Sequence, residues 1–330
     1  MNRSVRISYA LVILLLGLIV WLHLGTLLLT TLFGYLALNL FNFRRNKPLS
    51  VTIYLVVVAV IVSGLVYFAG LAYHTLPRIA ETAIPAMTSF AEKNGFQLPF
   101  SDFESLKSAA LAQAEEGVAV IGRYAWVASL QFVLLLAGLV VAVSLFLNAS
   151  WTATGAPPAS EPAENLYDAV TRELSVRFRS LYHSFSMVIG AQIIISVINT
   201  VLTTIFLLCN GYPYAPLLIV FVFLCGLLPV VGNLISNSLI VGVGFTLSPH
   251  TGIYALIFLI AIHKLEYFLN SKIVGRRINS PMWLTLIGLI VGERLMGITG
   301  MILAPVLLHF LKVEASRYRA TAAVEPDPQS

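Results

Sequence analysis

The chain has 330 residues, of which 58% are hydrophobic and only 11% are charged. A soluble domain carries roughly 25% charged residues, so this composition excludes an ordinary soluble protein and indicates a membrane protein. The net charge of +5 does not indicate a nucleic-acid partner, because the basic residues cluster beside hydrophobic runs, as the orientation rule for membrane helices predicts. The two cysteines, Cys209 and Cys225, lack metal-ligand and CxxC spacing, so no metal site or disulfide is predicted.

Several apolar runs along the chain reach the ~20 residues that a helix needs to cross a bilayer. They are continuous and not alternating, which favours helices over barrel strands. We therefore predict an all-α, polytopic integral membrane protein. It would have about six full spans and a pair of broken or re-entrant helical hairpins of opposite orientation.

Residues 1–48 are predicted to form a transmembrane hairpin. Residues 7–43 are apolar and would extend roughly 55 Å as a helix, about twice the thickness of the hydrocarbon core. Arg3 and Arg6 precede this stretch and the basic residues 44–47 follow it, so both ends are expected in the cytoplasm. No small-residue cleavage site follows, which favours a retained anchor over a signal peptide.

Residues 49–148 are predicted to hold two further spans around a polar section. That section, residues 74–123, contains Pro77, Pro85 and Pro99, which interrupt it. Its acidic residues outnumber its basic ones, and we expect a helical excursion outside the cytoplasm.

Residues 149–183 are predicted to be a cytoplasmic linker followed by an amphipathic helix. The linker is rich in Pro, Ala and Ser. The helix would place apolar residues on one face and arginines on the other (Val170, Leu174, Phe178 and Leu181 opposite Arg172, Arg177 and Arg179). Two alternatives remain open for this helix. It could lie on the inner membrane surface, or it could be a solvated connector that packs on the rest of the protein. The fifth span follows, over residues 184–209.

Residues 184–312 are predicted to form a core with the first of the hairpins. Residues 215–247 would make a helix roughly 50 Å long, too long for one span. Pro229 and Gly232 can break it, because proline cannot continue the hydrogen-bond ladder and glycine adopts torsion angles that other residues avoid. The basic loop at residues 272–277 requires this segment to leave and return to one side, so its tip lies at the break, within the membrane or across it.

The second hairpin is predicted from the opposite side, before a cytoplasmic tail at residues 313–330. Short apolar arms flank the sequence GERLMGITG, and both ends are basic. Its tip would hold Glu293 and Arg294, as a gate or a structural lock. Opposed hairpins with polar tips are typical of alternating-access carriers, because irregular backbone at membrane depth needs cover by protein or a watery cavity.

Polar residues inside the apolar spans are the candidate pathway residues. His263, Glu266 and Asn270 share one helix face. Because ionisable groups in membranes are functional candidates, Glu266 could bind a solute, a cation or a proton. The alternative is a structural hydrogen bond to a neighbouring helix, with His263 as the partner.

Two further sets of polar residues are candidates. A stripe on the fifth span consists of Gln192, Ser196, Asn199 and Thr203, and such stripes usually join helices. Asn233 and Asn237 flank the tip of the first hairpin, where a carboxamide could bind a hydroxylated solute.

In order along the chain, the sequences GYPYAPLL, LLPVVGNLI, LEYFLNSKIVGRRINSP and GERLMGITGMILAPV resemble the signatures of the autoinducer-2 exporter family. The resemblance is strong over residues 184–312 and rests on layout before them. It implies a homo-oligomeric secondary transporter of the bacterial inner membrane. The basic flanks described above place both termini in the cytoplasm. The family name comes from export of a quorum-sensing molecule, and other members are linked to sodium/proton exchange.

The resemblance assigns family positions to particular residues. The Pro-x-x-Gly turn falls on Pro229 and Gly232, the glutamate of the penultimate span on Glu266, and the final glycines on Gly297 and Gly300. There are departures as well. Ser271 stands at a position where many family members have proline. The charged pair Glu293–Arg294 stands at a hairpin tip whose residues are often small and apolar in the family.

The leading hypothesis is a carrier, embedded in the lipid bilayer, that moves a small polar organic solute outward. A cation/proton antiporter and a non-transporting scaffold are the alternatives. No GxSxG, HExxH or comparable motif occurs, so we do not predict an enzyme. No cofactor is predicted, apart from coupling to H⁺ or Na⁺.

Overall fold

The computed structural model describes residues 3–42, 46–95, 118–148, 165–228, 231–269 and 282–317. Within these ranges the chain forms helices and no strand, which confirms the all-α class. The helices are α1 (Arg3–Trp21), α2 (Gly25–Leu40), α3 (Lys47–Lys93), α5 (Val118–Leu147), α6 (Leu166–Cys209), α7 (Ala215–Gly226), α8 (Val231–Leu247), α9 (Pro249–Leu269) and α10 (Met282–Ser316).

Five of the described helices are long and apolar enough to cross a membrane: α1, α3, α5, α6 and α10. This confirms a polytopic membrane protein. The sequence also predicts spans at α2 and α9, but α2 has only 16 residues and α9 is not among the five. α10 qualifies by length, although its backbone leaves helical torsion angles at Met296 and Gly297.

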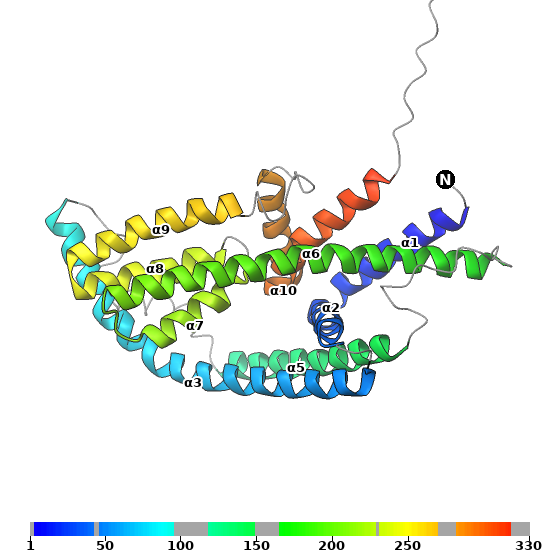
Figure 1. Ribbon diagram of the computed structural model, residues 1–330, viewed down its shortest axis with the longest axis horizontal. Helices are drawn as coiled ribbons and strands as arrows, with labels where there is room; N and C mark the ends of the chain where they lie inside the picture. Colours follow the sequence, from blue (N-terminus) through cyan, green and yellow to red (C-terminus); the bar gives the residue numbers. More distant parts are fainter. Residues whose placement is uncertain are drawn as a thin grey trace, which may run out of the picture.

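Helix α6 connects the two packed halves of the molecule and runs through most of its length (Figure 1). Its C-terminal half packs with α7, α8, α9 and the second half of α3, in a core that includes Leu207 and Ile240. Its N-terminal half packs with α1, α2 and the end of α10, around Phe185 and Val306. A smaller core joins α2, α3 and α5.

Helix α3 differs from its prediction, because Pro77 and Pro85 lie inside it and do not end it. The helix bends strongly along its length (Figure 1), as expected where prolines remove backbone hydrogen bonds. Its N-terminus is capped by Asn46, whose side chain accepts a hydrogen bond from the backbone N–H of Leu49. Residues 96–117, which hold the rest of the expected excursion and Pro99, lie outside the described residues.

Helix α6 also differs, because the expected amphipathic helix and the fifth span form one continuous helix of 44 residues. The arginine that the sequence places on the polar face, Arg177, is 3% exposed, whereas Phe178 of the expected apolar face is 38% exposed. The packed face is therefore rotated relative to the predicted one. The physical reason is that α10 and α1 supply partners for Arg177, as described below.

Candidate functional site

The break between α7 and α8 falls where the sequence places it. α7 ends at Gly226, and α8 begins at Val231. Across the described part of the break, the N–H of Leu228 donates to the carbonyl of Cys225 at 2.8 Å. At Gly232, a Cβ atom would overlap that same carbonyl, so only glycine allows the arms to meet this closely. Pro229 lies outside the described residues.

The polar stripe on α6 binds the end of α7. Gln192 donates from Nε2 to the carbonyl of Gly226 at 2.7 Å, and Ser196 donates from Oγ to the carbonyl of Phe223 at 2.9 Å. The last carbonyls of a helix have no partner within it, and in an apolar setting each needs one from elsewhere. Gln192 and Ser196 therefore act as side-chain caps for the broken helix.

Immediately after the break, Asn233 of α8 meets Glu266 of α9. Asn233 donates from Nδ2 to Oε2 of Glu266 at 2.5 Å, and the two residues are only 3% and 7% exposed. The pairing brings together two candidates that are 33 positions apart in the sequence. The pair is a buried hydrogen bond between a carboxyl group and a carboxamide.

The predicted hydrogen bond between His263 and Glu266 is not formed. His263 is exposed, and the partner that the structure gives to Glu266 is Asn233 and not His263. Asn270 lies outside the described residues. The neighbouring Lys264 is exposed as well. Among the described residues of this group, Glu266 alone is buried.

Further polar groups are buried in the same half of the molecule. Asn237 and Ser236 on α8 are 6% and 1% exposed, and Asn199 and Thr203 on α6 are 2% and 1% exposed. The Oδ1 atom of Asn199 accepts no hydrogen bond from any residue that the structure describes. A buried carboxamide oxygen without a partner is able to accept a hydrogen bond from a solute or water.

The second hairpin is formed by α10, which folds back on itself. Gly297 has φ 61° and ψ −141°, a left-handed conformation that favours glycine, and it turns the chain between two helical arms. The arms touch through Gly292 and Gly300, because a Cβ atom on either would overlap the carbonyl of the other. Glu293 and Arg294 form an ion pair of 3.8 Å beside this turn, with side chains 51% and 84% exposed.

The comparisons with known proteins identify the family of the chain. A family model described as "AI-2E family transporter" matches residues 5–320. The chain belongs to the AI-2E transporter family. It is also 36% identical over 132 residues to the "Putative transport protein YdbI" of Bacillus subtilis (strain 168). That match covers 39% of this chain and 37% of the relative, so it spans well under half of either protein.

A buried charge cluster in this AI-2E transporter was missed by the sequence reasoning. Arg177 of α6 lies 3.2 Å from Glu314 of α10 and 3.0 Å from Glu173. Its guanidinium carbon lies 4.4 Å from the centre of the Tyr9 ring on α1, and the hydroxyl of Tyr9 donates to Glu314 at 2.8 Å. Arg317 pairs with the other oxygen of Glu314 at 3.3 Å. Only the spacing of Glu173 and Arg177, four residues apart, is a signal in the sequence, and it predicts an ordinary surface pair.

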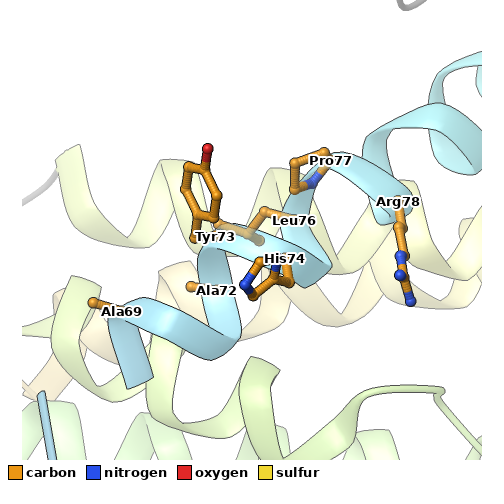
Figure 2. Close-up of a pocket in the computed structure, with 7 residues that line it drawn as sticks. All are labelled: Ala69, Ala72, Tyr73, His74, Leu76, Pro77 and Arg78. Carbon is orange, nitrogen blue, oxygen red and sulfur yellow. The ribbon is translucent and has the colours of Figure 1, made fainter. Parts of the chain in front are cut away.

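A surface depression of the transporter lies apart from these polar groups. It has a volume of about 690 Å³ and is lined by seven residues of α3 between Ala69 and Arg78, at the bend of that helix (Figure 2). None of the lining residues belongs to α7, α8 or α9. The described residues also contain no group of three or more His, Cys, Asp and Glu side chains able to hold a metal ion. The candidate transport site is therefore the closed polar set around Asn233 and Glu266.

Proposed function

We propose that this AI-2E transporter is a secondary carrier of the bacterial inner membrane that exports a small polar organic solute, such as autoinducer-2, by alternating access. The observation that carries the proposal is the buried Asn233–Glu266 pair beside the broken α7–α8 segment. Ionisable groups inside a membrane protein mark solute or ion pathways, because their burial is costly without a function or a partner. In this proposal the α7–α8 and α10 hairpins are re-entrant, and both termini are cytoplasmic.

The chemistry of the pair fits a hydroxylated solute. The carboxylate of Glu266 accepts hydrogen bonds, and a solute hydroxyl can donate to it in place of the Asn233 carboxamide. Once displaced, Asn233 offers two N–H donors and one carbonyl acceptor to the same solute. Asn237 lies one helical turn further along α8 and is also buried, so it can extend the contact.

Asn199 of α6 lies at about the same level along the helix axes as Glu266 of α9. Phe206 of α6 stacks on Phe258 of α9, with ring centres 4.4 Å apart. The two helices run in opposite directions (Figure 1). Asn199 precedes Phe206 by about two turns and Glu266 follows Phe258 by about two turns, so both are roughly 11 Å from the stack along their helices. We include in the proposed pathway the Oδ1 of Asn199, which has no hydrogen-bond partner among the described residues.

The tip of α10 serves as a gate in this proposal. Glu293 and Arg294 are exposed and 3.8 Å apart, so their pairing can be exchanged for contacts with a solute or with another segment at little cost. Gly297 provides the turn that presents them. A homo-oligomer is part of the proposal. Native mass spectrometry of the purified protein would give the number of subunits.

The second candidate function is sodium/proton antiport. It is favoured by the burial of Glu266, because a buried carboxyl group can alternate between a proton and a cation as the site opens to each side. In this case H⁺ and Na⁺ would compete for Glu266, and no organic solute would move. A non-transporting scaffold would move neither.

Flux into proteoliposomes tests the proposal. We would compare the wild type with Glu266→Gln and Asn233→Leu, using labelled autoinducer-2 with and without a proton gradient, and sodium in parallel. Glu92→Gln is the matched control, because it makes the same chemical change at an exposed position at the end of α3. Size-exclusion profiles would show that every variant is folded.

The outcomes separate the candidates. Autoinducer-2 flux that falls at least tenfold in both variants and persists in Glu92→Gln supports the solute carrier. If only sodium moves, and Glu266→Gln abolishes that flux, the antiporter hypothesis replaces the solute carrier. Undiminished flux in both variants would show that the Asn233–Glu266 pair is structural and would overturn the site.

A further inference from the structure

The bend of α3 carries an open depression whose lining differs in character from the rest of that helix. It is lined by Ala69, Ala72, Tyr73, His74, Leu76, Pro77 and Arg78. Figure 2 shows these side chains around the turn that leads into Pro77. The proline changes the direction of the helix at this point, which leaves a hollow that a straight helix would not have.

The charged lining of the depression is basic. His74 and Arg78 are one helical turn apart, so they project from the same side of α3 (Figure 2), and both are exposed. No acidic residue is part of the lining. Among the residues that the structure describes, no carboxylate forms an ion pair with Arg78. The hollow is thus suited to a ligand with a negative charge.

The depression also lies at the end of an apolar stretch. Residues 48–73 contain no Asp, Glu, Lys, Arg or His, and as a helix they would extend about 39 Å, enough to cross the hydrocarbon core with some tilt. His74 and Arg78 are the first ionisable residues after it, so they fall at the level of the lipid headgroups. Tyr73 stands beside them with 78% of its surface exposed, and tyrosines are enriched at that level.

The protein interior lies on the other side of the same turns. Thr75 and Ile79 are 9% and 2% exposed, and Ile79 belongs to the core that α3 shares with α7 and α8. Ala72 and Leu76 of the lining pack against this same core, whereas Tyr73, His74 and Arg78 are exposed, so the depression opens to the surface at the edge of the transport half. It is in the position of a boundary lipid.

We propose that the bend of α3 is a binding site for an anionic glycerophospholipid. The headgroup phosphate is held by Arg78 and His74, and an acyl chain lies along the apolar turns at Ala69 and Ala72. Arg78 carries most of the electrostatic attraction, because its guanidinium can donate two parallel hydrogen bonds to phosphate oxygens. A soluble phosphate has no use for the apolar turns, so the site selects the lipid and not the free anion.

Native mass spectrometry of the intact protein in detergent tests this inference. Phosphatidylglycerol and phosphatidylcholine would be titrated into the wild type, Arg78→Gln and His74→Gln. Lys93→Gln is the matched control, because it removes one positive charge from an exposed position of the same helix, 15 residues beyond Arg78. A second series would add inorganic phosphate before phosphatidylglycerol.

We expect the wild type to prefer phosphatidylglycerol, and Arg78→Gln to weaken that binding about fivefold, the effect of one basic residue near an anionic lipid. Lys93→Gln should change it less than twofold, and inorganic phosphate should not displace the lipid. An equal loss of phosphatidylglycerol binding in Arg78→Gln and Lys93→Gln would show that binding depends only on net charge, and would overturn the site. Equal binding of both lipids, or displacement by inorganic phosphate, would also overturn it.

Discussion

The buried contact between Arg177 and Glu314 is predicted to hold α6, α1 and α10 together. Both side chains are at most 5% exposed, and their charged atoms are 3.2 Å apart. Removing one member of such a buried pair costs about 3 to 5 kcal/mol, because the other charge stays buried. Each partner keeps other contacts here, since Glu314 also binds Arg317 and Tyr9, and Arg177 also binds Glu173. We therefore expect Arg177→Met and Glu314→Leu each to cost about 3 kcal/mol, the lower end of that range.

A double-mutant cycle measures the coupling. Unfolding would be followed by titrating SDS into mixed micelles and recording helical circular dichroism. In the double variant neither charge is left buried alone, so it should lose about 2 kcal/mol less than the sum of the single variants. The exposed pair Arg294–Glu293 supplies the control, with an expected coupling below about 1 kcal/mol. Additive losses at Arg177 and Glu314, within about 0.5 kcal/mol, would refute a direct buried interaction.

Further predictions concern the broken helix and are read from the melting temperature in detergent. Gly232→Ala should destabilise the protein by about 1 to 3 kcal/mol, because its Cβ atom would overlap the carbonyl of Cys225, and an unchanged melting temperature would contradict that close contact. Gly226→Ala would bring a Cβ atom to 2.6 Å from Oγ of Ser196 and should destabilise the protein; Ser196→Gly, which loses the cap on Phe223, should therefore cost less in the Gly226→Ala background than in the wild type. Gln192→Leu should cost about 1 to 3 kcal/mol, because the carbonyl of Gly226 loses its donor; a neutral effect would mean that this carbonyl finds another partner.

The class of the protein and the place of its breaks could be predicted from the sequence because both follow from local signals. Long apolar runs identify membrane helices without any knowledge of packing. The length of residues 215–247 required a break, and α7 ends at Gly226, within a few residues of the predicted tip. Gly232 does not supply the break through unusual torsion angles, because it lies in the first turn of α8 without a positive φ; it instead allows the close contact with the carbonyl of Cys225. The turn at Gly297 was likewise marked by the glycines and the charged pair that interrupt the apolar arms on either side.

The features that could not be predicted from the sequence depend on tertiary contacts. Prolines normally suggest an interruption, but α3 continues through Pro77 and Pro85, and its second half packs against α8 in a shared core that includes Ile79. Arg177 looked like a surface residue because its partners Glu314 and Tyr9 come from opposite ends of the chain. No periodic pattern in the sequence of α6 indicates those partners.

The broken helix explains how the polar residues of α6 divide between two roles. Ending α7 inside an apolar region leaves carbonyl groups without partners, and each must find a donor. Gln192 and Ser196 meet this need, so these members of the stripe are committed to holding the break and are poor candidates for solute contacts. Asn199, one turn further from the break, has no such carbonyl to cap and keeps a buried oxygen without a partner among the described residues. The residues open to a solute are therefore those beyond the caps, and Asn199→Leu should lower flux with little loss of stability, whereas Gln192→Leu should do the reverse.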